Sequence, residues 1–96
     1  MPRELPDGLV RASGTPEFTQ DKVADALRAS HALAPERWGL LQLLSGALLF
    51  VDEETGAEYA LTARDTWVIL PELRHHIRIS GPVSFRIDFY RQAHTD

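Results

Sequence analysis

From Arg37 onwards the chain alternates short apolar runs with turn-forming residues. About five or six runs of roughly five to eight residues can be distinguished, a spacing typical of a β-sandwich or barrel. No helical segment alternates with these runs, which argues against a parallel α/β sheet. We therefore predict one all-β domain over residues 1–96. Its turns are expected at Ser45-Gly46, 54–56, 63–65, Pro71-Glu72 and 80–82.

Two of the runs, WGLLQLL at 38–44 and GALLFV at 46–51, are almost continuously apolar. A half-buried strand alternates apolar and polar side chains, whereas a continuous apolar run is typical of a strand covered on both faces. We expect one face of these strands to line a barrel. The other face is expected to pack against a second sheet or a partner subunit.

The segment that precedes these runs is less regular. Residues 1–17 contain three prolines and two glycines, which predicts an extended, irregular arm around the outside of the fold. Residues 18–33 fit two patterns. Local propensity favours a helix capped by Thr19, whereas a period of two would place His31 and Leu33 on one face of a strand.

Adjacent histidines interrupt the run LRHHIRI at 73–79. Successive side chains of a strand point to opposite faces, so His75 shares a face with Ile77 while His76 shares the other with Arg78. Because isoleucine belongs in the core, we predict that His75 points inward and that His76 lies at the surface. An inward histidine is most often structural, with its ring bonded to a backbone carbonyl.

A metal site would need further ligands that converge on His75. His31 is the candidate partner, because His94 lies in the polar stretch 92–96, where we expect a flexible tail. Asp88 is the candidate carboxylate, since it stands in the apolar run VSFRIDFYR and a buried charge needs a partner. The alternative is that this face is exposed and that Asp88 pairs with Arg86 or with a neighbouring strand.

Composition and charge narrow the class of protein. The 96 residues are 44% hydrophobic and 25% charged, with net charge −4, a single lysine and scattered arginines, so nucleic-acid binding is not expected. The chain has no cysteine, so a metal would be held by nitrogen and oxygen ligands. No apolar run is long enough to span a bilayer and the start does not resemble a signal peptide, so we expect a cytoplasmic protein without membrane contact.

The order of several stretches resembles a known family. GTPEFT is followed by His31, then by RWGLLQLLSGALLF, LTARDTWVILPELRHHI and GPVSFRIDFYR. This order is similar to that of the small single-domain cupins associated with tellurite resistance, the TehB/YeaR-like cupins. The resemblance covers about residues 5 to 91 and implies a double-stranded β-helix, or jelly-roll barrel, paired as a homodimer. It also favours the strand interpretation of residues 26–33.

In such cupins histidines and a carboxylate from different strands hold a metal inside the barrel. The resemblance therefore implies His31, His75 and Asp88 as ligands of a divalent transition metal: zinc, iron, nickel or manganese. The chain departs from most cupins, because no second histidine and no glutamate follow His31 at the usual spacing. The implied function is a metal-binding cupin linked to tellurite or oxidative stress resistance, with a small molecule or oxyanion as ligand. The alternatives are a metal-dependent small-molecule oxygenase or isomerase and a non-catalytic binding or interaction module.

Overall fold

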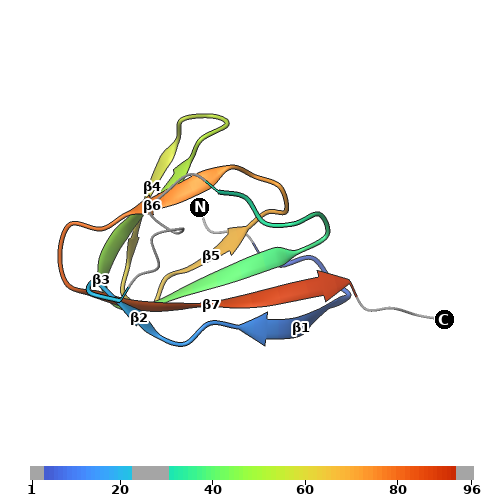
Figure 1. The fold of residues 1–96 in the computed structure, drawn as a ribbon, viewed down its shortest axis with the longest axis horizontal. Helices are drawn as coiled ribbons and strands as arrows, with labels where there is room; N and C mark the ends of the chain where they lie inside the picture. The colour runs from blue at the N-terminus through green and yellow to red at the C-terminus, as the bar shows by residue number, and fades with distance from the viewer. Residues whose placement is uncertain (1–3, 23–30, 93–96) are drawn as a thin grey trace.

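The computed structural model of the chain describes residues 4–22 and 31–92, and these residues form seven strands and no helix (Figure 1). The strands are β1 (Leu9–Gly14), β2 (Phe18–Thr19), β3 (Trp38–Asp52), β4 (Glu58–Thr62), β5 (Thr66–Ile69), β6 (His75–Arg78) and β7 (Val83–Gln92). All pairings between them are antiparallel. The all-β prediction is confirmed, and the architecture is compatible with a small β-barrel or jelly roll.

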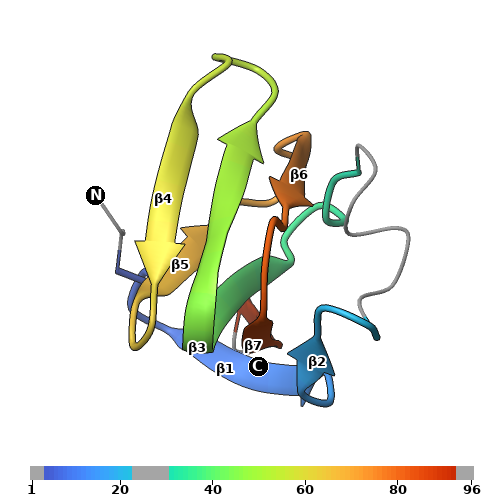
Figure 2. The ribbon, with the colours of Figure 1, turned by 90° about the vertical axis from the view of Figure 1, so that its left-hand side faces the viewer.

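The long strand β3 belongs to two sheets. Its first half pairs with β5 and β7, and β7 in turn pairs with β1 and β2. Its second half pairs with β4 and β6. Figure 2 shows β3 and β4 rising together away from β1, with β6 on the side of β3 opposite β4 and with β5 behind β4. The interior lies between the two sheets that share β3.

The passage of β3 from one sheet to the other occurs at Ser45 and Gly46. The pairing register with β7 shifts between Leu43 and Ser45, and Gly46 has a φ of 80°. A Cβ at Gly46 would lie 2.1 Å from the carbonyl oxygen of Pro82, so only glycine fits there. The turn predicted at this dipeptide is therefore wrong, because the backbone forms a bulge that bends one continuous strand.

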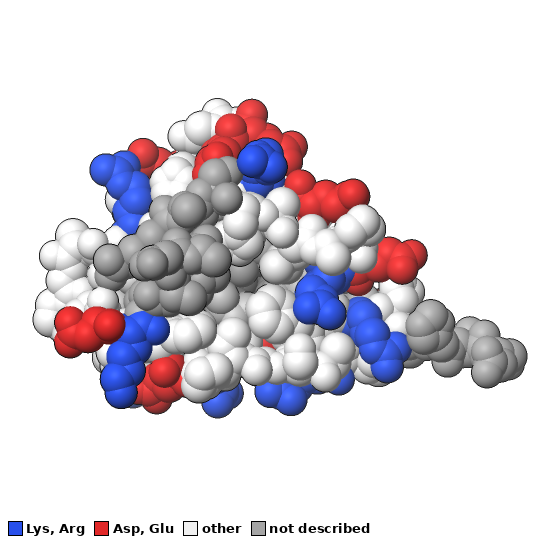
Figure 3. Space-filling view, in the orientation of Figure 1, with Lys and Arg blue, Asp and Glu red and all other residues white. Residues whose placement is uncertain are grey.

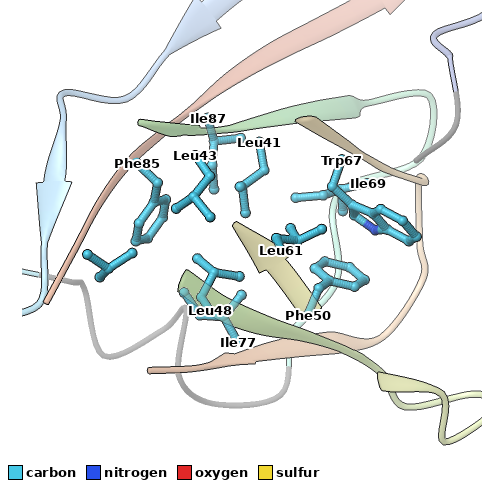
Figure 4. Close-up of a cluster of buried hydrophobic side chains, with 11 residues drawn as sticks. Leu41, Leu43, Leu48, Phe50, Leu61, Trp67, Ile69, Ile77, Phe85 and Ile87 are labelled. Atoms are coloured by element: carbon cyan, nitrogen blue, oxygen red, sulfur yellow. The ribbon is translucent and has the colours of Figure 1, made fainter. Parts of the chain in front are cut away.

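The core is built from the inward faces of both sheets (Figure 4). Eleven buried residues form its central cluster: Leu41, Leu43, Leu48, Phe50, Leu61, Trp67, Ile69, Ile77, Val83, Phe85 and Ile87. They come from every strand from β3 to β7, so the core ties together segments far apart in sequence. Removal of these apolar side chains from water is the main stabilising contribution in a domain of this size.

The N-terminal arm is more regular than its sequence suggests. Residues 9–14 form β1, which pairs with β7 along its outer edge, and Phe18 pairs with Phe85. The strand predicted over 26–33 falls largely on residues 23–30, which lie outside the described residues. At the end of the predicted strand, His31 forms a single β-bridge with His75 and Leu33 forms one with Pro71.

Charged side chains of both signs surround the face seen in Figure 3. Acidic side chains gather towards the end that carries the β3–β4 turn, and basic ones lie mainly along the edge formed by β1 and β7. No helix among the described residues has the length and apolar character needed to cross a membrane. On this face no continuous basic surface appears.

Candidate metal centre

His31 and His75 are joined through their backbones. The N–H of His31 donates to the carbonyl of His75 at 3.0 Å, and the N–H of His75 donates to the carbonyl of His31 at 2.9 Å. Residues that exchange both hydrogen bonds face each other directly in an antiparallel pair, so their side chains leave the same side. The two imidazole rings accordingly meet edge to face, with centroids 4.3 Å apart. The topology thus brings together two histidines that are distant in sequence.

His75 is held in one orientation, and its surroundings favour the neutral ring. Its side chain points inward as predicted, with only 1% of the residue exposed, and the ring stacks on Phe50 at 5.0 Å. Its Nδ1 lies 2.8 Å from the carbonyl oxygen of Leu73. Because a carbonyl only accepts hydrogen bonds, Nδ1 carries the proton of the neutral ring and Nε2 retains its lone pair. Burial lowers the pKa of His75, against the opposing effect of the Leu73 carbonyl, and this favours the neutral ring.

His31 contributes a buried nitrogen that lacks a partner. Its Nδ1 is shielded from solvent and makes no hydrogen bond to any residue that the structure describes. Leaving such an atom unsatisfied costs about 1–3 kcal/mol, so a native fold retains it only for a reason. Its ring lies against that of His75. An electron-pair acceptor at this position would satisfy the nitrogen.

These features fit a metal ion that has two imidazole ligands from the protein. A hydrogen bond from one ring nitrogen to a backbone carbonyl is the usual means of aiming the other nitrogen at a metal. Within residues 4–22 and 31–92, no three His, Cys, Asp or Glu side chains gather as a metal-binding group. A metal held by His31 and His75 would therefore complete its coordination with water or with an exogenous ligand.

The structure places Asp88 in a different cluster. Its Oδ2 accepts a hydrogen bond from Gln42 Nε2 at 2.6 Å, and its Oδ1 accepts from Arg11 Nε at 3.3 Å and from Nη2 at 3.2 Å. Phe85 and Ile87 fill the core from the opposite face of β7, so Asp88 points away from the interior. It is nevertheless only 7% exposed. Asp88 therefore pairs with a residue of the neighbouring strand β1, as in the alternative considered for it, but it is buried and does not lie on an exposed face.

Four further residues of the chain, Glu58, Tyr59, His76 and Tyr90, carry side chains that could move a proton. His76 Nδ1 lies 2.7 Å from Glu53 Oε2 on the outer side of β6, and Glu58 forms an ion pair with Arg78 at 3.5 Å. Tyr59 packs against Trp67. Each of these three has a contact away from the histidine pair, and the fourth, Tyr90, is partly buried on β7.

Sequence reasoning missed two contributors to these clusters. Nothing in the sequence distinguishes Phe50 from the other apolar residues of its run. Only the cross-strand register places it diagonal to His75. Arg11 lies in the irregular arm, 77 positions from Asp88, and no local pattern connects the two. The alternation of Phe85, Ile87 and Asp88 along β7 was the one available signal that Asp88 faces outward.

Comparison with known proteins adds a family and a fold. The TehB-like domain family matches residues 13–87, which is most of the chain. No curated protein sequence matches. Two solved structures are similar: TehB from Haemophilus influenzae, with a TM-score of 0.77 and 23% identity, and a structural-genomics target protein from E. coli strain K12, with a TM-score of 0.86 and 20% identity.

The extent of these matches differs. The alignment with the E. coli protein covers 96% of this chain and 99% of that one. The alignment with TehB covers 90% of this chain and only 32% of the other, so this chain spans about a third of the length of TehB. At such identities the structural likeness establishes the fold and nothing about ligands.

Proposed function

Because the chain belongs to the TehB-like domain family, we propose that it is a small metal-binding cupin in which His31 and His75 hold a divalent transition metal: zinc, iron, nickel or manganese. The observation that carries the proposal is the buried Nδ1 of His31, which has no hydrogen-bond partner among the described residues and belongs to a ring that lies beside the ring of His75. A metal ion there would accept the free lone pair and remove the cost of leaving it unsatisfied.

The residues around the pair fix the tautomer, the plane and the separation of the two rings. The Leu73 carbonyl fixes the tautomer of His75, and the ring of Phe50 fixes its plane. The backbone exchange between His31 and His75 sets the separation of the two rings before any ligand binds. Such preorganisation reduces the ordering that binding would otherwise require. A metal, when bound, would supply a Lewis acid that attracts the oxygen atoms of an anion or small molecule.

We further propose that the ligand is a small oxyanion or oxygen-rich metabolite. Two protein ligands leave about two positions open in a four-coordinate site, and open positions are what an exogenous oxygen ligand requires. The resemblance of the sequence to cupins associated with tellurite resistance supports an oxyanion in particular. Sequestration of the anion is the role favoured here over turnover, because Tyr59, Glu58 and His76 have contacts elsewhere.

Self-association is a second part of the proposal. The β4–β3–β6 sheet borders a hollow of about 320 Å³, lined by Ala47, Leu49, Ala60 and Arg78 together with the buried Leu48 and Leu61 and their neighbours. Leu44 nearby on β3 is 43% exposed. Exposed apolar surface of this kind favours burial against a second copy, as the sequence resemblance also implies. Light scattering across a range of concentrations tests this point.

The metal site is tested by titrating purified protein, stripped with a chelator, with Zn²⁺, Fe²⁺, Ni²⁺ and Mn²⁺ in a calorimeter. We expect one ion per chain for at least one of these metals. His75→Ala and His31→Ala should each weaken that binding by at least about 100-fold, because each removes half of the protein ligands.

His76→Ala is the matched control, since it removes a neighbouring imidazole that faces Glu53 on the outer side of β6. It should bind metal like the wild type. Full stoichiometry and affinity in His75→Ala would refute the site, as would equal loss in all three variants.

A further inference from the structure

A continuous row of aromatic rings leads from the histidine pair to β4. His31 lies 4.3 Å from His75, and His75 lies 5.0 Å from Phe50 between ring centroids. Phe50 lies 5.7 Å from Trp67, and Trp67 lies 4.4 Å from Tyr59. Each separation is within the range of direct ring contact. The row therefore connects the proposed metal site at His75 on β6 to Tyr59 on β4 without a break.

The two ends of this row differ in how readily their rings are oxidised. Tryptophan and tyrosine are the side chains most readily oxidised by one electron among aromatic residues, whereas phenylalanine and neutral imidazole resist it. The two oxidisable rings stand together at the end remote from the histidines. Trp67 is buried, with 5% exposure, whereas Tyr59 is partly exposed. Phe50 separates Trp67 from His75 by a single ring.

From this arrangement we infer that Tyr59 and Trp67 are a one-electron relay that carries electrons from the protein surface to the His31–His75 pair. The inference rests on the proposed function to the extent that the oxidant is a metal ion in a higher valence, such as iron or manganese, at that pair. The relay would protect His75 and the core from oxidation whenever such a metal meets a peroxide.

The relay moves one electron at a time from a thiol through Tyr59 and Trp67 to the oxidant. Trp67 loses one electron to the oxidant through the intervening ring of Phe50 and becomes an indole radical cation. Tyr59 then donates one electron to Trp67, which returns to its neutral state, and the phenolic proton of Tyr59 passes to water. The resulting neutral phenoxyl radical takes one electron and one proton from a thiol in solution. Two thiyl radicals formed in this way combine to a disulfide.

The chain contains a matched control pair in Trp38 and Tyr90. These residues are cross-strand partners of β3 and β7, and neither belongs to the row of rings described above. They are the remaining tryptophan and the remaining tyrosine of the sequence. A Trp38→Phe background leaves Trp67 as the sole indole, and Tyr90→Phe removes a tyrosine outside the row.

The relay itself is tested without a metal. Laser photoionisation of Trp67 in metal-free Trp38→Phe protein creates the indole radical, and transient absorption follows its fate. We expect the indole signal to decay as a phenoxyl signal rises. That rise should be lost when Tyr59→Phe is added and retained when Tyr90→Phe is added. A phenoxyl signal that survives Tyr59→Phe, or is absent from the parent, overturns the relay.

The connection to the histidine pair needs a second experiment. Protein loaded with Fe²⁺ is treated with hydrogen peroxide, and mass spectrometry locates the oxidised residues. We expect modification at Tyr59 in the wild type, suppressed by added thiol. In Tyr59→Phe the oxidation should shift to Trp67, and thiol should no longer protect.

The two experiments separate failure of the relay from failure of the proposed function. If calorimetry finds no metal bound, the proposed function falls while photoionisation still decides whether Tyr59 reduces Trp67. If metal binds but His75→Ala gives the same oxidation pattern as the wild type, the oxidant acts from solution and the connection to the pair is refuted.

Discussion

His31 and His75 exchange both of their backbone hydrogen bonds, and this pairing brings their imidazoles within 4.3 Å of each other. The bridge attaches the chain segment around His31 to the edge strand β6. The same contact therefore has a structural part in the backbone and a chemical part in the rings. Experiments on the pair must separate these two parts.

Protonation of His75 should destabilise the metal-free protein. Burial lowers its pKa from the ordinary value of 6.5, so below pH 6.5 the unfolded chain takes up a proton that the folded chain resists. The unfolded state then binds more protons, and the free energy of unfolding falls as the pH drops through this window. One histidine contributes a slope of at most about 1.4 kcal/mol per pH unit.

Urea unfolding between pH 7.5 and 5 measures this slope. The slope should become smaller in His75→Asn and stay close to the wild-type value in His76→Asn, since His76 is on the outer side of β6. An unchanged slope in His75→Asn would show that some other group causes the acid sensitivity.

Asp88→Asn should lower stability and leave metal binding intact. The substitution removes the charge that Arg11 and Gln42 contact, and a charge-assisted hydrogen bond contributes about 1.5–3 kcal/mol. We expect the free energy of unfolding to fall by about 1–3 kcal/mol, with unchanged metal stoichiometry by calorimetry. Loss of metal without loss of stability would instead restore Asp88 to the ligand set that the sequence resemblance implies.

Phe50→Leu tests whether the orientation of His75 contributes to metal affinity. Leucine keeps an apolar side chain in the core but removes the stacked ring. We expect about tenfold weaker binding, the lower end of what is lost when a supporting residue of a metal ligand is changed. Leu48→Ala removes as many carbon atoms as Phe50→Leu from the buried cluster but lies outside the row of rings, so it is the control for general loosening. Equal affinity in both variants would remove Phe50 from this role.

The inward direction of His75 could be predicted because it depends only on local alternation. Ile77 anchors one face of β6, so the parity of every neighbour on that strand follows. The same rule applied to Phe85 and Ile87 indicates that Asp88 faces outward, as the structure shows. Strand periodicity thus specifies which face a residue occupies.

The partners of these residues could not be predicted in the same way. The sequence does not specify that His75 pairs with His31 or that Asp88 pairs with Arg11, because only the complete topology brings them together. That residues 9–14 form the strand β1 could not be predicted for a related reason. It lies at a sheet edge and is largely exposed, so it lacks the apolar alternation that marks a strand.

The two glycines at Gly46 and Gly56 show how similar local sequence signals can have different structural meanings. Both have a positive φ, 80° and 79°, and both stand where turn residues gather. At Gly56 a Cβ would meet nothing within 4 Å, as expected for an exposed turn. At Gly46 it would collide with the Pro82 carbonyl, because the bulge in β3 packs closely against the chain that enters β7. Only the tertiary contact distinguishes them.

Gly46→Ala should therefore be much more damaging than Gly56→Ala. Alanine in the left-handed region costs about 1–2 kcal/mol at either position. At Gly46 the clash with Pro82 must also be relieved by moving backbone, which adds about 1–3 kcal/mol. Denaturant unfolding of the two variants isolates the second contribution as the difference between them. Equal losses would mean that β3 can bend at Ser45 without the close approach to Pro82, and that the bulge does not fix the angle between the two sheets.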